Sequence, residues 1–189
     1  MAERRTERAA APLTPERLER AALAYLERYA NSAAGLARVL QRRLSKAERQ
    51  GRAAAGAADI EAVIAKLRRA GLLDDGLFAE GRAGRLARQG RSQRSIARRL
   101  AAAGLGEAEI ARGLAAAGAA PADELARAVA FARRRRLGPF RAPRERAVRK
   151  LRDMAALARQ GFAYDLVRRV IEAPDAAALD RLRQEWAEQ

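Results

Sequence analysis

The chain has 189 residues, of which 39 are Lys or Arg and 23 are Asp or Glu, so its formal net charge is +16. It contains no cysteine and no histidine, which excludes disulfides, thiolate nucleophiles, the usual zinc sites and the commonest general base. Hydrophobic residues, mostly alanine, make up 49% of the sequence and aromatic residues only 4%, a mixture rich in helix formers. We therefore expect an all-α fold with thin cores, and a nucleic acid or an acidic protein surface as partner.

The first 13 residues are expected to form a disordered tail. They mix charges of both signs and lack the apolar segment of a signal peptide. No run in the chain approaches the roughly 20 apolar residues that span a bilayer. We therefore expect a cytoplasmic protein.

Residues that cap helix N-termini recur along the chain and predict about nine or ten helices of ordinary length. Helix starts are expected at Thr14, Ser32, Asp59, Asp74, Ser92, Asp123 and Asp175. Left-handed glycines that end helices are expected at Gly51, Gly71, Gly90, Gly104, Gly118, Gly138 and Gly161. Two segments, 45–58 and 137–143, are interpreted as linkers.

An internal repeat connects these predicted helices. The pentapeptide LARQG occurs at residues 86–90 and again at 157–161. The helix that follows each copy carries an apolar pair at corresponding positions, Ile96 and Leu100 and then Val167 and Ile171. A weaker third copy keeps this spacing at Leu26, Ala30, Leu36 and Leu40. Coincidence in a low-complexity sequence is the alternative explanation.

We interpret the repeats as an elongated, curved array of three tandem three-helix units. Stacked helical repeats contact mainly their neighbours and present an extended concave surface to a macromolecule. The predicted units cover residues 14–58 including a linker, 59–118 and 119–173. Residues 174–189 are predicted to add a last helix, in which Trp186 is expected to pack.

Residues 73–80 have the sequence LDDGLFAE, which resembles the LDD-x-x-FA signature of the RecX family. Segments around residues 25–40, 88–105 and 159–171 resemble that family's first, second and third repeats. The residues to which the resemblance gives a structural role are Leu73, Asp74, Asp75, Phe78, Gly90, Ile96, Leu100, Gly104, Gly161 and Phe162. Asp74 and Asp75 are expected to cap a helix N-terminus and not to bind a metal, because adjacent residues diverge on a helix.

Two positions depart from the family pattern. Ser92 replaces the second glycine of the usual G-x-G-P entry, a tolerable change because serine is a good N-cap. Arg82 stands where the family has an aromatic or other apolar residue, so its helix is expected to bury less apolar surface.

The resemblance implies a non-enzymatic regulator of the RecA recombinase in DNA repair and recombination. Such a protein lies along the groove of the RecA–DNA filament, bridges neighbouring protomers, and restrains strand exchange and ATP hydrolysis. It needs no cofactor and no metal. We further expect a monomer with no membrane contact, and DNA as a possible second partner through the basic surface.

Two arginine clusters are the candidate partner-binding residues. From Gly81 to Gly106 there is no acidic residue, and the cluster there includes Arg82, Arg85, Arg88, Arg91, Arg94 and Arg98. A merely solvated helix face would normally interleave both signs, so we interpret this cluster as a contact surface for phosphates or carboxylates. The second cluster comprises Arg133, Arg134, Arg135 and Arg136, after which basic residues continue at Arg141, Arg144, Arg146, Arg149, Lys150 and Arg152.

The main alternative is a basic helical DNA-binding module that has no recombinase partner. Residues 92–114 are predicted to form helix, glycine turn and helix, but Leu100 occupies the position where a DNA-binding helix-turn-helix needs alanine. Eight aromatic residues are few for a base-stacking single-strand binder. An enzyme is not expected, because the chain has no histidine, no cysteine and no phosphate-binding glycine loop.

Overall fold

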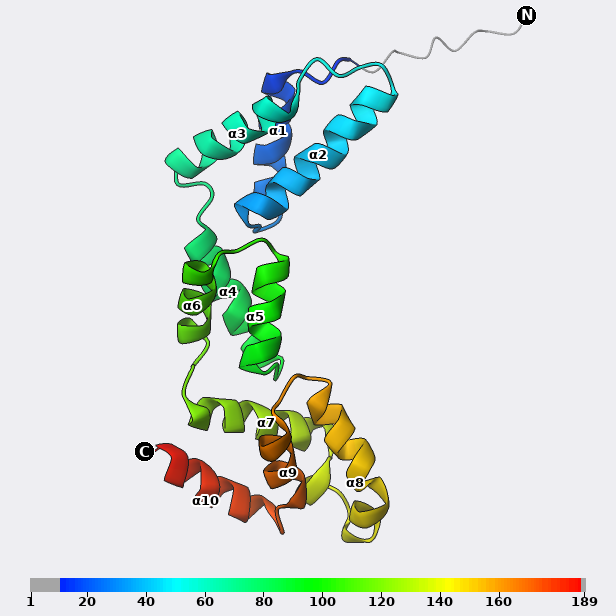
Figure 1. Ribbon diagram of the computed structural model, residues 1–189, viewed down its shortest axis with the longest axis vertical. Coiled ribbons are helices and arrows are strands. Elements are labelled where there is room, and N and C mark those ends of the chain that lie inside the picture. Colours follow the sequence, from blue (N-terminus) through cyan, green and yellow to red (C-terminus); the bar gives the residue numbers. More distant parts are fainter. Residues whose placement is uncertain (1–10, 188–189) are drawn as a thin grey trace, which may run out of the picture. The chain divides into compact units, whose positions relative to one another are not determined.

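The computed structural model describes residues 11–187, and this part of the chain forms ten α-helices, a single 3-10 helix and no strand (Figure 1). In chain order the helices are α1 (Pro15–Leu26), α2 (Ala33–Arg49), α3 (Ala57–Arg69), α4 (Asp75–Arg88), α5 (Gln93–Ala102), α6 (Glu107–Ala116), α7 (Pro121–Arg135), η1 (Gly138–Phe140), α8 (Pro143–Ala158), α9 (Tyr164–Glu172) and α10 (Ala176–Ala187). The all-α prediction is confirmed. Residues 1–10 of the predicted tail lie outside the described residues.

The chain divides into two compact units, and the division falls between Asp75 and Gly76 in the sequence. In the first unit α1, α2 and α3 pack on one another around a leucine-rich core. Fully buried members include Leu18, Leu36 and Leu40, each of which contributes about 1.5–3 kcal/mol relative to an exposed side chain. Leu13 precedes α1 and exchanges backbone hydrogen bonds with Arg52 and Ala54.

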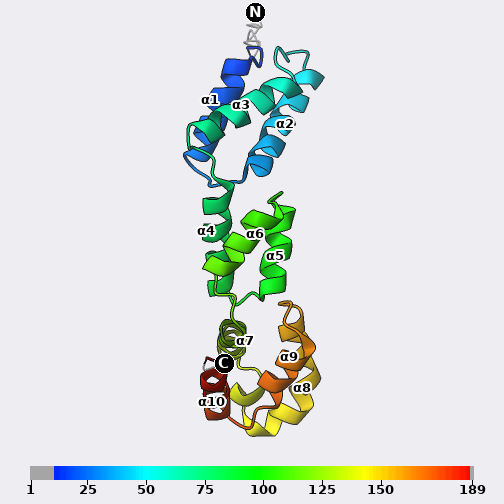
Figure 2. The same cartoon turned by 60° about the vertical axis from the view of Figure 1, so that its left-hand side comes forward.

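The second unit has two groups of buried side chains. Helices α4, α5 and α6 surround one of them, which includes Ala79, Leu86 and Ile96. Helices α7 to α10 and the short helix η1 surround the other, into which α10 brings Leu179 and Trp186. Figure 2 shows α8 and α9 on one side of this second group, with α10 beside α7. Packing of Trp186 is confirmed, and its ring also lies 5.8 Å from the Arg169 guanidinium carbon.

Polar side chains join the two parts of the second unit. The hydroxyl of Ser92 caps α5 by accepting from the Ser95 amide, and it donates to the carbonyl oxygen of Gln160 at 2.9 Å. Glu124 of α7 accepts a hydrogen bond from the backbone amide of Gln93, in the first turn of α5. The same hydroxyl therefore provides both the helix cap and the tertiary contact. Ser92 is fully buried, so water cannot replace either hydrogen bond.

Several predicted helix starts are confirmed by side-chain hydrogen bonds. Thr14, Ser32, Ser92 and Asp175 each accept from a backbone amide three residues later. Two predictions are wrong. Helix α3 has Gly56 as its N-cap, and Asp59 lies three residues further on and reaches back to the Gly56 amide at 2.7 Å. Asp123 likewise lies within the first turn of α7, after the N-cap Ala120.

All seven glycines predicted to be left-handed have a positive φ. Gly138 differs from the others because it does not end a helix directly: Arg136, with φ 53°, is the left-handed C-cap of α7. A Cβ atom at Gly138 would lie within 3.0 Å of the Ile171 backbone, so both the conformation and the space require glycine there.

The predicted linkers and one unit boundary need correction. Helix α2 continues to Arg49 through the first part of segment 45–58, and segment 137–143 contains η1, whose Gly138 and Pro139 are buried. Helix α3 packs with α1 and α2, so the predicted boundary between residues 58 and 59 is wrong for the packing. The array of three related repeats stays a prediction. None of the described helices combines the length and apolarity needed to cross a bilayer.

Asp75 connects the ends of three helices around the first unit. One of its carboxylate oxygens accepts from the backbone amide of Ala33, the first residue of α2, at 2.8 Å. The other accepts from the guanidinium of Arg68 in the last turn of α3 at 2.6 Å. Asp75 itself begins α4, so the helix cap expected of this aspartate is formed with α2, 42 residues earlier in the chain.

Asp75→Ala is expected to lower the free energy of unfolding by about 1–2 kcal/mol, because the Ala33 amide loses its acceptor and Arg68 its ion-pair partner. Asp75→Asn keeps an acceptor oxygen and should lower the free energy of unfolding by less than Asp75→Ala does. Urea denaturation followed by circular dichroism measures both. Glu61→Ala, which removes an exposed carboxylate from α3, is the control, and equal losses in all three variants would contradict this role of Asp75.

Candidate functional site

The first arginine cluster lies on α4, on α5 and on the turn between them. Arg85 and Arg88 of α4 and Arg94 and Arg98 of α5 are exposed, whereas Arg91 in the turn is partly buried. Among the described residues, none of these five guanidinium groups forms a hydrogen bond or an ion pair with another side chain. They are therefore available to an anionic partner.

Arg82 differs from the rest of this cluster. Its side chain is partly buried, and its guanidinium carbon lies 5.7 Å from the centre of the Phe78 ring, a cation–π arrangement. Its Nε is buried and has no hydrogen-bond partner in the described part of the chain. Arg82 stands where the RecX pattern has an apolar residue. Packing against Phe78 allows an arginine at this position, and its side chain is only partly exposed to solvent.

The four consecutive arginines at the end of α7 have four different environments. Arg134 donates to the backbone carbonyls of Arg88 and Gln89, at 3.2 and 2.9 Å, and thereby closes the C-terminus of α4. The guanidinium carbon of Arg133 lies 5.2 Å from the Phe140 ring centre, and Arg136 is the left-handed C-cap of α7. Arg135 lines a pocket. Two members of the cluster predicted from sequence, Arg133 and Arg134, thus make contacts within the chain, although all four side chains are exposed.

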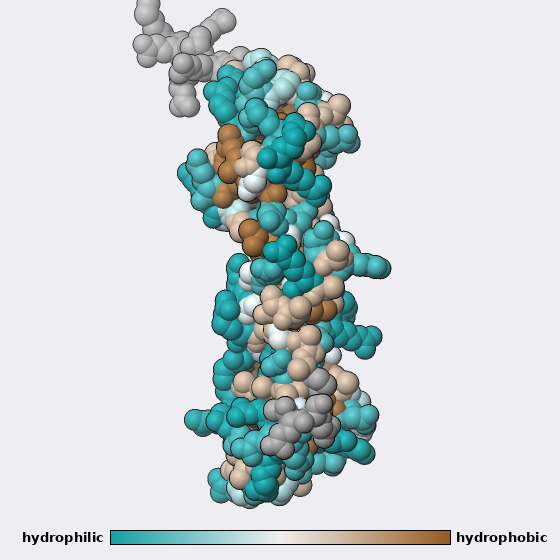
Figure 3. All heavy atoms as spheres, turned by 90° about the vertical axis from the view of Figure 1, so that its left-hand side faces the viewer, coloured by the Kyte–Doolittle hydropathy of each residue, from teal (hydrophilic) through white to brown (hydrophobic). Residues whose placement is uncertain are grey.

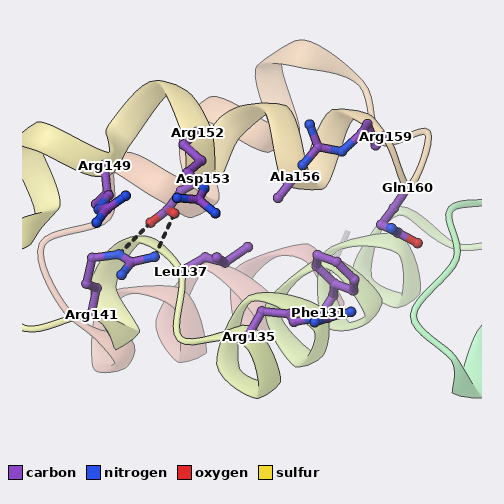
Figure 4. A pocket seen from close by; sticks show the side chains of 10 residues that line it. All are labelled: Phe131, Arg135, Leu137, Arg141, Arg149, Arg152, Asp153, Ala156, Arg159 and Gln160. Atoms are coloured by element: carbon purple, nitrogen blue, oxygen red, sulfur yellow. Dashed lines mark hydrogen bonds and ion pairs between the residues drawn. The ribbon is translucent and has the colours of Figure 1, made fainter.

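The pocket beside Arg135 is lined mainly by arginines and has a volume of about 480 Å³. Figure 4 shows Arg149, Arg152 and Arg159 on the α8 side and Arg135 with Phe131 on the α7 side. Arg135 belongs to the second arginine cluster predicted from the sequence, whereas Arg149, Arg152 and Arg159 were not among the predicted contact residues. The available signal was the spacing of 149, 152 and 159, which places the three arginines on one face of a helix.

An ion pair between the buried Asp153 and the partly buried Arg141 forms one wall of this pocket. Asp153 is 1% exposed, and its carboxylate accepts from Arg141 Nε at 3.0 Å, from a terminal nitrogen of Arg141 at 2.9 Å and from the Gly138 amide at 2.9 Å. The pKa of Arg141 is raised above its ordinary value, chiefly by the hydrogen bond to Asp153. The pair fixes η1 to α8 and leaves Asp153 without a free charge toward the pocket.

The face drawn in Figure 3 is mostly hydrophilic. Figure 3 shows one face on which strongly hydrophobic side chains gather in the first unit, whereas the second unit exposes mainly hydrophilic and weakly apolar groups. No group of three or more acidic side chains in the described chain could hold a metal ion. The arrangement of the second unit suits binding of anions.

Comparison with known proteins gives two matches. The chain is 38% identical over 167 residues to the regulatory protein RecX of Myxococcus xanthus, and the alignment covers 87% of this chain and 89% of the relative. The chain belongs to the RecX family. A crystal structure of a regulatory protein RecX superposes with a TM-score of 0.62 at 18% identity, covering 84% of this chain and 72% of that one, and thus shares the fold. No protein-family model matches the chain.

The residues that carry the RecX resemblance have structural positions in the fold. Leu73, Ile96, Leu100 and Phe162 are buried, and Phe78 packs against the core of α4 to α6. Gly90, Gly104 and Gly161 have the predicted left-handed conformation. A side chain at Gly161 would collide with the Ser92 hydroxyl, so this RecX glycine is required by the contact that joins α5 to the end of α8.

Asp153→Asn is expected to lower the free energy of unfolding by about 1.5–3 kcal/mol, because the Arg141 guanidinium loses its buried counter-charge but keeps its ion pair with Glu145. Thermal and urea denaturation of the purified variant measure the loss. Asp180→Asn, at an exposed position of α10, is the matched control and should change stability by less than about 0.5 kcal/mol. Equal stability of the two variants would show that the pair does not hold η1 in place.

Proposed function

We propose that this protein binds the RecA–DNA filament and regulates it, in the direction of inhibiting recombinase and ATPase activity. Membership of the RecX family carries the proposal. The composition supports it, since a chain with net charge +16 and no histidine or cysteine is better suited to binding an anionic assembly than to catalysis.

The exposed arginines of α4 and α5 are the proposed contact surface. Their guanidinium groups (Arg85, Arg88, Arg94 and Arg98) have no partner among the described residues, although carboxylates elsewhere in the chain form ion pairs with other cations. Carboxylates of the recombinase or phosphates of the enclosed DNA would supply the missing counter-charges, with bidentate hydrogen bonds to the planar guanidinium groups.

Regulation would come from differential affinity. A protein that binds a blocked or disassembling filament more tightly than an active one shifts the population toward the blocked form, and it needs no chemistry of its own. One molecule that bridges neighbouring recombinase subunits would affect more than one of them. Inhibition below one molecule per recombinase subunit follows from this mode of action.

The geometry of α5 and α6 disfavours the sequence-reading DNA module. Helix α6 holds the place of the second helix of a helix-turn-helix, but Glu107 and Glu109 occupy its first turn, where base contacts are normally made. Arg112, further along α6, is paired with Glu80 of α4. In a helix-turn-helix this end of α6 would enter the major groove of DNA, where the two glutamates would repel the phosphates.

The test is DNA-dependent ATP hydrolysis by the RecA of the same organism on single-stranded DNA, with this protein titrated at near-physiological salt. Inhibition should be half-complete well below one molecule per recombinase subunit. Absence of any effect, together with tight and steeply salt-dependent binding to naked DNA, would contradict the proposal.

The double variant Arg85→Gln/Arg88→Gln is expected to need about ten times more protein for the same inhibition, which corresponds to about 1.4 kcal/mol of lost binding energy. Glutamine keeps helix propensity and removes only the charge. The pair Arg181→Gln/Arg183→Gln on α10 removes the same charge from exposed positions and should leave inhibition unchanged. Equal weakening by both pairs would show that only net charge matters.

A further inference from the structure

We propose that the pocket between α7 and α8 is a binding site for a polyphosphate group, carried by a nucleoside triphosphate or by an inorganic polyphosphate chain. The pocket is formed by residues separate from the exposed arginines of α4 and α5. Its volume of about 480 Å³ falls within the usual range of small-molecule sites.

The charge of the pocket is the first argument. The guanidinium groups of Arg135, Arg149, Arg152 and Arg159 form no hydrogen bond or ion pair with any described residue. The pocket's carboxylate, Asp153, is already occupied by Arg141 and by the Gly138 amide. Four unpaired cations around one pocket repel one another, and this repulsion is relieved by a compact anion that carries several charges.

The arrangement on α8 is the second argument. Arg149, Arg152, Ala156 and Arg159 follow one face of the helix, as Figure 4 illustrates, and all line the pocket. The small side chain of Ala156 leaves space between Arg152 and Arg159. The arginines thus surround a hollow and do not simply cover a convex surface.

The lining also indicates which part of a ligand is recognised. The aromatic residue of the pocket, Phe131, is only 8% exposed and belongs to the core. A single-stranded nucleic-acid site would need a basic groove along the backbone and exposed aromatic rings on which bases stack. The pocket instead lines up cations along α8 without an exposed ring, which favours a chain of linked phosphates over a base.

Isothermal titration calorimetry with the full chain at about 0.1 M salt tests the proposal. Tripolyphosphate and ATP should each bind at one site, and AMP at least about tenfold more weakly, since it has a single phosphate. Equal affinity for tripolyphosphate and ATP would identify the phosphate chain as the whole ligand. Tighter binding of ATP would identify a nucleotide, and both results support a polyphosphate site.

Two kinds of variant locate the site. Arg149→Gln/Arg152→Gln should weaken tripolyphosphate binding at least about tenfold, whereas the matched pair Arg181→Gln/Arg183→Gln should leave it unchanged. Ala156→Leu fills the hollow without removing a charge and should also weaken binding. Circular dichroism and thermal denaturation verify that each variant is folded.

Three results would overturn the proposal: no saturable binding of tripolyphosphate, equal weakening by the pocket and control pairs, or a pocket pair that loses affinity only for a single-stranded oligonucleotide. The last result would assign the pocket to a nucleic-acid backbone. Arg85→Gln/Arg88→Gln should keep full affinity for tripolyphosphate, so failure of the filament proposal and failure of the pocket proposal are distinguishable.

Discussion

The structure depends on hydrogen bonds between the backbone groups at helix ends and side chains from other parts of the chain. The largest fully buried side chains are mainly leucines, and their packing leaves the backbone groups at the helix ends without hydrogen-bond partners. Asp75 caps α2, the Ser92 hydroxyl reaches the Gln160 carbonyl, Arg134 closes α4, and Arg127 donates to the carbonyls of Ala117 and Gly118 at the end of α6. Each of these contacts satisfies backbone groups that the helix leaves unpaired and also joins two segments of the chain.

This arrangement divides the arginines into two sets. Arg127, Arg134, Arg141 and Arg146 direct their donors to carbonyls or carboxylates of the same unit. The guanidinium groups of the other set have no such partners in the described part of the chain and are exposed: Arg85, Arg88, Arg94, Arg98, Arg135, Arg149, Arg152 and Arg159. These groups are therefore open to an external anion, while the internal set supports the fold. The proposals on filament contact and polyphosphate binding concern only the outward set.

Sequence reasoning predicted the helical class, the left-handed glycines and most N-caps, because these depend on a few neighbouring residues. It failed at Asp59 and Asp123, since an acid in the first turn resembles an N-cap in sequence. The boundary at residue 58 was wrong because the apolar face of α3 does not reveal which helices it will pack against. The pocket was missed for the same reason: its arginines come from α7 and α8, and only the fold brings them together.

The most direct test of the regulatory account compares binding of fluorescently labelled protein to RecA filaments assembled on single-stranded DNA, to free RecA and to naked DNA at the same salt. The account predicts that affinity for the filament exceeds affinity for either component by at least about tenfold, and that Arg85→Gln/Arg88→Gln removes most of this difference. Equal or tighter binding to naked DNA, with no further gain from RecA, would contradict it.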